Sequence, residues 1–142
     1  MSAFELISDL HKDARGFRPS ASYIEAFFAK TESEQQAQWD SLCAEFDRRE
    51  MEEARQELAA QRKYEQRLAS MQADYNIDRT TAIRWDLDGN DESLEEIDYA
   101  LTHYGIADQE IDHFLWKQGI AFQLYPAYRA EFEVALGLDR AA

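Results

Sequence analysis

The sequence contains one cysteine, five glycines and two prolines among its 142 residues. The single thiol, Cys43, cannot form an intramolecular disulfide, which favours a reducing, cytoplasmic setting. Glycine and proline interrupt helices, so their scarcity leaves long stretches that can remain helical. β-Branched residues are also few, whereas the helix formers Ala, Glu, Gln, Leu and Arg dominate. The composition therefore predicts an all-α fold.

Long apolar runs are missing as well. No segment approaches the roughly 18 consecutive apolar residues of a membrane-spanning helix, so no contact with membrane is expected. Residues 1–5 show neither the basic start nor the apolar centre of a secretion signal, and none is expected. Hydrophobic residues nevertheless make up 45% of the chain and aromatic residues 13%, too much for a disordered acidic tail. We expect one helical domain over residues 1–142.

Basic side chains are scarce. Lys and Arg number 15 against 29 Asp and Glu, which gives a formal net charge of −14, and no Lys or Arg lies between Asp86 and Asp112. Proteins that bind DNA or RNA neutralise phosphates with Lys and Arg and release counterions. This charge therefore argues against direct binding of nucleic acid and against attraction to anionic membrane surfaces.

The same stretch is dense in carboxylates. They are Asp86, Asp88, Asp91, Glu92, Glu95, Glu96, Asp98, Asp108, Glu110 and Asp112. One interpretation is a solvated helix face, because acids are favoured near helix N-termini. The other is a surface that reproduces the charge of a nucleic-acid backbone and occupies a basic groove of a partner protein. We take these carboxylates as the predicted partner-binding residues, and other acidic interfaces or metal binding stay open.

Three segments are expected inside the domain: an N-terminal helical pair (residues 1–30), a long helix (31–76) and an acidic helical cluster (77–142). The chain has no glycine or proline from residue 20 to residue 88, which predicts one helix over about residues 32–75, either straight or folded back as a hairpin. At 1.5 Å per residue this helix would reach about 65 Å. Part of it is therefore expected to project from the domain or to meet another chain.

A narrow apolar stripe runs along the end of this predicted helix. Its members follow one another at spacings of four, three and four residues, which is typical of a coiled coil. The predicted oligomer seam consists of Tyr64, Leu68, Met71 and Tyr75.

Short polar motifs predict where the helices begin and end. A Ser or Thr followed three residues later by Glu fits a capping box, as in Ser2–Glu5, Ser22–Glu25 (with Ser20 as the alternative start), Thr31–Glu34 and Ser93–Glu96. Further N-caps are expected at Asp108 and at Asn76 or Asp78. Glycines are expected to end helices, at Gly16, Gly105, Gly119 and Gly137. The only expected extended segment is residues 120–125.

Motifs for catalysis or cofactor binding are lacking. The segment 86–92 resembles the start of a calcium loop, but the positions that require Gly and a bidentate Glu hold Asp91 and Ile97. The three histidines share no metal-type spacing, and Cys43 is expected to be a small buried thiol rather than a nucleophile. We therefore predict no enzyme, no cofactor and no metal site. An enzyme whose acids hold a divalent metal is the remaining alternative.

A motif near the start of the chain resembles a known family. Lys12-Asp13, two further residues and Gly16-Phe17-Arg18-Pro19 are similar to a motif of small phage-encoded proteins without an established activity, and the segment 81–85 with its Asp-rich turn is similar to their later part. The resemblance carries no activity with it. It implies a phage origin and a role inside the infected cell, in the host cytoplasm.

Two functions follow from these observations. The first is a non-enzymatic phage-type binding protein, an inhibitor that mimics nucleic acid and occludes a basic, nucleic-acid-binding site of a host protein during host takeover or against host defence. The alternative is a phage structural or assembly protein that oligomerises through the long helix, for example as a homodimer.

Overall fold

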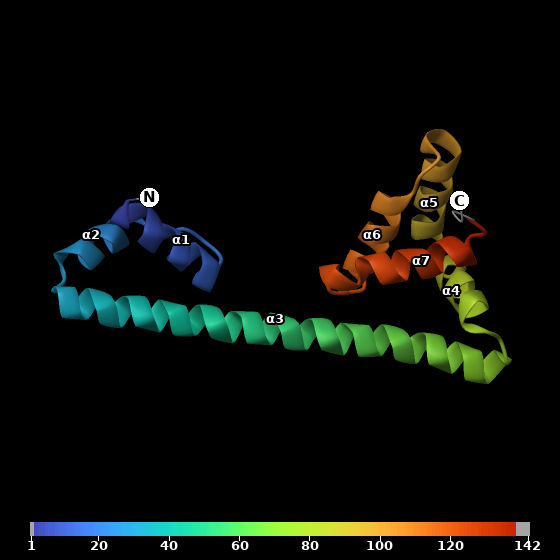
Figure 1. Ribbon diagram of the computed structural model, residues 1–142, viewed down its shortest axis with the longest axis horizontal. Coiled ribbons are helices and arrows are strands. Elements are labelled where there is room, and N and C mark those ends of the chain that lie inside the picture. The colour runs from blue at the N-terminus through green and yellow to red at the C-terminus, as the bar shows by residue number, and fades with distance from the viewer. Residues whose placement is uncertain (1, 139–142) are drawn as a thin grey trace. The chain divides into compact units, whose positions relative to one another are not determined.

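A computed structural model describes residues 2–138, and every regular element in that range is helical (Figure 1). The elements are α1 (Ala3–Arg15), α2 (Ala21–Ala29), α3 (Glu32–Tyr75), α4 (Arg79–Asp88), α5 (Asp91–Tyr104), α6 (Asp108–Lys117), the short 3-10 helix η1 (Phe122–Leu124) and α7 (Tyr125–Ala135). The predicted all-α fold, with one long helix and a C-terminal cluster of shorter helices, is confirmed. Helix α3 is continuous, so the hairpin alternative is wrong.

The chain forms two compact units, Met1–Ala54 and Arg55–Ala142, where the sequence predicts a single domain. The boundary lies inside α3. All side chains of residues 47–59 are exposed, so this part of α3 contributes to neither hydrophobic core in the described residues. Each unit has its own core because the buried apolar residues of α3 lie on either side of this exposed stretch, Leu42 before it and Tyr64 and Leu68 after it.

Local capping sets the helix starts of the N-terminal unit. Ser2 and Glu5 form the predicted capping box at α1, with the Ser2 amide donating to the Glu5 carboxylate at 2.7 Å. Ser20, the alternative to Ser22, caps α2. Thr31 and Glu34 make the predicted reciprocal bonds at the start of α3. The core of this unit consists of Ile7, Ala14, Ile24, Phe27 and Leu42.

Local contacts hold the motif of residues 12–19 in place inside the N-terminal unit. Gly16 ends α1 with φ +88°, a left-handed conformation that glycine adopts without strain. The buried His11 ring contacts the Phe17 carbonyl through Nδ1 at 2.8 Å, and Arg18 donates to Asp9 at 2.7 Å. Each of these contacts holds the turn after α1 against the helix itself. The motif therefore has a structural explanation.

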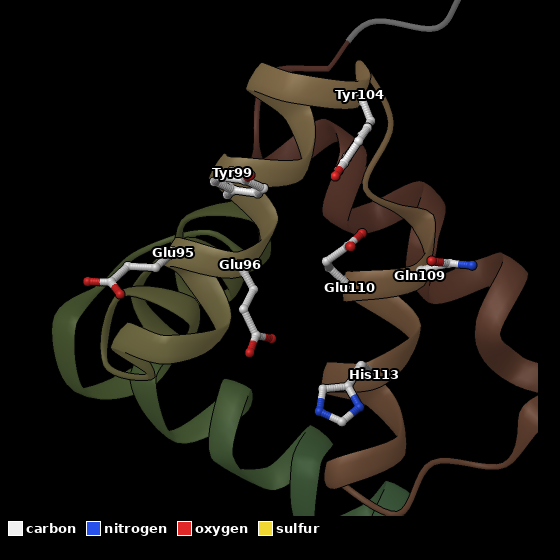
Figure 2. A pocket seen from close by; sticks show the side chains of 7 residues that line it. All are labelled: Glu95, Glu96, Tyr99, Tyr104, Gln109, Glu110 and His113. Carbon is white, nitrogen blue, oxygen red and sulfur yellow. The ribbon is translucent and has the colours of Figure 1, made fainter.

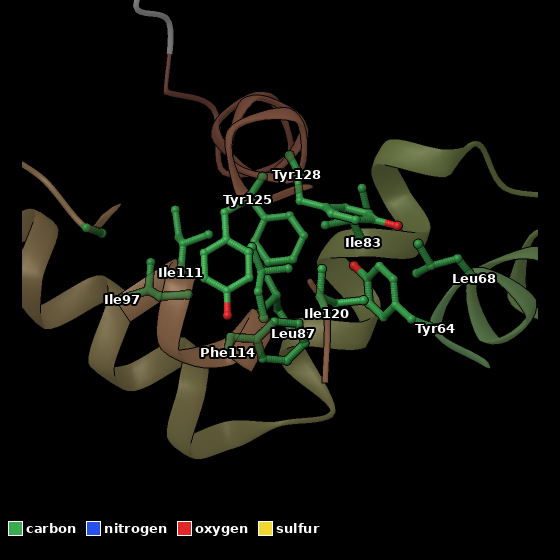
Figure 3. Close-up of a cluster of buried hydrophobic side chains, with 14 of the residues drawn as sticks. Tyr64, Leu68, Ile83, Leu87, Ile97, Ile111, Phe114, Ile120, Tyr125 and Tyr128 are labelled. Carbon is green, nitrogen blue, oxygen red and sulfur yellow. The ribbon is translucent and has the colours of Figure 1, made fainter. Parts of the chain in front are cut away.

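The C-terminal unit packs the end of α3 against α4, α5, α6 and α7. Figure 3 shows this core from close by, with aromatic and aliphatic side chains from all five helices meeting in one cluster. The labelled members are Tyr64, Leu68, Ile83, Leu87, Ile97, Ile111, Phe114, Ile120, Tyr125 and Tyr128. Burial of this apolar surface supplies the main stabilisation of the unit.

The predicted oligomer seam is corrected by this packing. Tyr64 is 1% exposed and Leu68 is 0% exposed, and Met71 packs against the same core. Tyr64 meets Tyr128 of α7 edge to face, with ring centroids 5.5 Å apart. The stripe was correctly identified as apolar, but its partner is the chain's own C-terminal unit. Only Tyr75 is exposed, so these residues do not form a seam for a second chain.

Helix starts in the C-terminal unit differ from the predictions in two places. Helix α5 begins at Asp91, so Ser93 lies inside the helix, where it is buried, and does not form a capping box. Helix α6 begins at Asp108 itself, one residue earlier than a cap at that position implies. Asp78, one of the two expected caps, accepts a hydrogen bond from the Thr81 amide at 2.7 Å.

The predicted extended segment at residues 120–125 is wrong. Its centre is η1, and α7 begins directly after it at Tyr125. The Leu124 amide donates to the Ala121 carbonyl at 2.9 Å. The alternating apolar residues resemble a strand, but the described chain contains no second strand that could pair with them, so the backbone bonds locally.

Candidate functional site

Helices α5 and α6 form the helix pair that carries most of the acidic stretch. Ile97 on α5 and Ile111 on α6 are both 1% exposed or less and anchor the pair in the core. Gly105 ends α5 with φ +72°, and its amide donates to the Leu101 carbonyl at 3.1 Å. The turn that follows is short because glycine accepts this left-handed conformation. The polar faces of both helices are thereby turned to the outside.

A groove of about 610 Å³ lies between these polar faces. Figure 2 shows Glu96 of α5 and His113 of α6 projecting toward the space between the two helices. The groove is lined by Glu95, Glu96, Tyr99 and Tyr104 from α5 and by Gln109, Glu110 and His113 from α6. Clefts of this size fall within the range of about 300–1,000 Å³ that ligand-binding sites occupy.

The carboxylates of the groove have no cationic partner. Among the described residues, no Lys or Arg forms an ion pair with Glu95, Glu96 or Glu110. Glu96 and Glu110 are half-buried, and Glu95 is exposed. Three like charges around one hollow create a negative potential that attracts cations. Their use by a partner stays a prediction.

Aromatic rings line the part of the groove near the C-terminal end of α5. Tyr99 is 57% exposed and Tyr104 is 70% exposed, and their ring centroids are 6.3 Å apart at an angle of 69°. His103 stacks on one face of the Tyr99 ring at 3.9 Å. At the other end of the groove, His113 stacks on Trp116, which is also largely exposed. Exposed tyrosine and tryptophan rings are typical anchors of binding surfaces.

Asp86 is not part of this surface. Its predicted role as a partner-binding residue is therefore wrong. It accepts two hydrogen bonds from Arg67, from Nε at 2.7 Å and from the terminal nitrogen at 2.9 Å, and it is 12% exposed. Arg67 also donates to Gln118 at 2.8 Å. The hydrogen bond to Asp86 raises the pKa of the Arg67 guanidinium above its ordinary value. Asp86 therefore links α4 to α3.

Asp112 is likewise an internal ion-pair partner, and its predicted role is corrected for the same reason. Arg129 donates to its two oxygens at 2.6 and 3.1 Å. The hydrogen bond to Asp112 raises the pKa of Arg129, and the negative charge of the half-buried Asp108 contributes to the same shift. Asp108 and Asp112 thus face the cation of α7.

Asp88 of α4 and Glu92 and Asp98 of α5 do not line the groove. Asp88 and Asp98 line a second hollow of about 310 Å³, and Arg84 is part of the same lining. Glu92 is exposed. Asp91 belongs to the backbone of α5, but its side chain lies outside the described part of the chain. Of the ten predicted carboxylates, three line the groove, two line the hollow beside Arg84, and Asp86 and Asp112 form internal ion pairs. Asp108 acts on the charge of Arg129, and Glu92 belongs to none of these groups.

The other candidates for a site are metal-ligating and nucleophilic side chains. Within residues 2–138, no group of three or more His, Cys, Asp or Glu side chains is placed to hold a metal ion. Cys43 is half-buried in the N-terminal unit. In the same described range, no helix combines the length and the apolar character needed to cross a membrane.

The tyrosines and the histidine of the groove were missed by the sequence interpretation. Tyr99 and His103 are one helical turn apart on the acidic helix, a spacing that places them on one face. This spacing was the available signal. His113 could not be assigned, because its position opposite Glu96 depends on how α5 and α6 pair.

Comparison of the chain with protein-family models, with curated proteins and with solved structures finds no match.

Proposed function

We propose that this chain is a non-enzymatic, phage-type binding protein whose α5–α6 face docks on a basic surface of a host protein. The observation that carries the proposal is the set of carboxylates at the groove, Glu95, Glu96 and Glu110, which no cation of the described chain neutralises. Unpaired charges of one sign repel one another and reduce stability. A complementary basic partner would remove that repulsion.

The expected mechanism is occlusion. A basic site that binds a nucleic-acid backbone presents Lys and Arg side chains to phosphates. Carboxylates held on two packed helices can occupy the same side chains, and the opposite charges also accelerate encounter of the two proteins. The host protein would then lose access to its nucleic acid. Such a role agrees with the phage origin that the N-terminal motif implies, as an inhibitor of host defence or an agent of host takeover.

Affinity capture followed by competition tests this proposal. The wild-type chain and a Glu92→Lys/Glu95→Lys/Glu96→Lys variant are immobilised and exposed to a nuclease-treated lysate of the bacterial host. The control variant carries Glu25→Lys, Asp47→Lys and Asp74→Lys, which make the same charge change at exposed positions elsewhere.

Proteins that wild type and control retain, and that the α5 variant does not, are purified and bound to labelled DNA or RNA. We expect the wild-type chain to displace the nucleic acid. We also expect its affinity for the captured protein to fall as the salt concentration rises. Retention of the same proteins by the α5 variant, or a captured protein that keeps its nucleic acid, would contradict the proposal.

A structural or assembly role is the second candidate, and the exposed middle of α3 favours it. Met51 is 65% exposed and Leu58 is 46% exposed, and they are one heptad apart on the helix. These residues replace the corrected seam as the expected contact between copies. Sedimentation of the wild-type chain beside Met51→Lys/Leu58→Lys tests it. Oligomers that dissociate in the variant support assembly, and a wild-type monomer at high concentration contradicts it.

A further inference from the structure

The groove between α5 and α6 has walls of two kinds that together point to one type of side chain. Carboxylates of Glu96 and Glu110 lie on the two helices, and the open rings of Tyr99 and Tyr104 lie beside them. Exposed carboxylates alone would attract any cation. Exposed aromatic rings alone would attract apolar groups. Their combination in one hollow favours a cation with a flat, weakly hydrated face.

We propose that the groove receives an arginine side chain of the basic host protein, an assignment that rests on the proposed docking function. The guanidinium is planar and offers several N–H donors in a fixed fork, which suits two carboxylates better than a lysine ammonium does. Its plane can also stack on a tyrosine ring, and its apolar stem can pack along the groove wall. A lysine would gain the charge attraction without the stacking.

The arrangement of the rings agrees with this occupant. His103 stacks on one face of Tyr99, at 3.9 Å between centroids, and Tyr99 is still 57% exposed. Tyr104 meets Tyr99 at an angle of 69°, so the two rings form adjoining walls and not one flat surface. Figure 2 shows Tyr104 and Glu110 on opposite helices, with the Tyr104 side chain directed toward Glu110. A guanidinium between them would meet a ring and a carboxylate together.

Charge complementarity favours a basic partner protein as the source of this arginine side chain. The groove lining contains three carboxylates and no Lys or Arg. A basic protein surface of the kind that binds nucleic-acid backbones is rich in arginine.

The test compares labelled peptides that differ only in the cation. Gly-Ser-spaced peptides carrying arginine, lysine or neutral citrulline at the same positions are titrated with the full chain at physiological ionic strength, and binding is followed by fluorescence anisotropy. We expect the arginine peptide to bind about five-fold more tightly than the lysine peptide and the citrulline peptide not to bind. Amide resonances of Tyr99, Tyr104 and Glu110 are expected to shift in the arginine titration.

Substitutions distinguish the contribution of the groove to peptide binding from that of the wider acidic surface. Tyr99→Ala/Tyr104→Ala is expected to abolish the preference for arginine over lysine and to leave lysine binding unchanged. The matched control, Tyr75→Ala/Phe122→Ala, removes two exposed rings outside the groove and is expected to keep the preference. Glu96→Gln/Glu110→Gln is expected to weaken both cationic peptides. Thermal melts of each variant establish that it remains folded.

Two results would overturn the inference in distinguishable ways. Equal binding of the arginine and lysine peptides, insensitive to the tyrosine substitutions but reduced by Glu92→Lys/Glu95→Lys/Glu96→Lys, would refute the arginine groove and leave acidic docking in place. Binding of neither cationic peptide to the wild-type chain would refute the groove and count against the proposed docking function as well.

Discussion

Asp86 and Asp112 are ion-paired inside the C-terminal unit, whereas Glu95, Glu96 and Glu110 have no cationic partner among the described residues. All five carboxylates belong to one stretch of sequence without Lys or Arg. The two paired acids connect helices, and the three unpaired acids line a hollow. A run of like charges can therefore contain two populations with opposite physical roles, one that connects helices and one whose charges repel each other.

The paired population extends beyond the acidic stretch. Arg79 donates to Glu65 at 2.6 and 2.9 Å and to Glu131 at 2.7 Å, so one guanidinium connects α3, α4 and α7. The Tyr128 hydroxyl donates to the same Glu65 at 2.6 Å. These half-buried networks hold the helices in register. Because the fold already uses these arginines, they are not available to neutralise the groove.

Removal of a paired acid is expected to have the largest effect on stability. Asp86→Ala leaves the Arg67 guanidinium without its bidentate partner and is expected to lower the free energy of unfolding of the C-terminal unit by about 2–3 kcal/mol. Glu95→Ala, from the unpaired group, is expected to change it by less than about 0.5 kcal/mol. Urea denaturation followed through resonances of the C-terminal unit measures both. Equal losses would refute the division into two populations.

The next largest effect is expected from low pH, which protonates paired carboxylates and so lowers the free energy of unfolding. The hydrogen bond from Arg79 lowers the pKa of Glu65, with a further contribution from Tyr128. A carboxyl whose pKa is lower in the folded state contributes stability above its unfolded pKa of about 4.3, and this contribution is lost as pH falls through the folded pKa. We expect Glu65→Gln to make the wild-type decline in unfolding free energy below about pH 4.3 shallower, by about 1 kcal/mol given its partial exposure. Parallel pH profiles would contradict this.

Salt is expected to act on the unpaired population in the opposite direction. Screening weakens repulsion among exposed like charges, so raising NaCl from about 0.02 M to about 0.5 M is expected to increase the wild-type free energy of unfolding by about 0.5 kcal/mol. Glu92→Lys/Glu95→Lys/Glu96→Lys is expected to remove most of this increase. Thermal melts at both salt concentrations measure it. An unchanged salt response in the variant would show that these acids do not repel one another appreciably.

The sequence was most informative where structure depends on neighbours along the chain. The bounds of α3 and the caps at Ser2, Thr31 and Asp78 were predicted because capping and helix breaking involve residues within one turn. The Ser93 box failed although its motif is local, because the turn at Gly89 allows α5 to start at Asp91 and draws Ser93 into the core.

The site was less predictable because its properties depend on distant residues. The acids that stay unpaired are those that Arg67 and Arg129 do not reach, and both arginines lie outside the acidic stretch. The groove exists because α5 and α6 pack side by side, which brings His113 opposite Glu96. Charge counting points to α4, α5 and α6, the helices that carry the acidic stretch. It could not separate structural acids from exposed ones.

The same contrast between paired and unpaired groups occurs among the core tyrosines, and the smallest effect is expected for the unpaired one, Tyr64. The Tyr64 hydroxyl is buried without a hydrogen-bond partner in the described protein, whereas the Tyr128 hydroxyl donates to Glu65. Burial raises the pKa of Tyr64, so its hydroxyl stays protonated. Tyr64→Phe is expected to change the free energy of unfolding by about 0–0.5 kcal/mol toward greater stability, and Tyr128→Phe to lower it by about 1 kcal/mol. Urea denaturation of the two variants measures these changes. If Tyr64→Phe lowered the free energy of unfolding as much as Tyr128→Phe, both hydroxyls would stabilise the core and the contrast would be refuted.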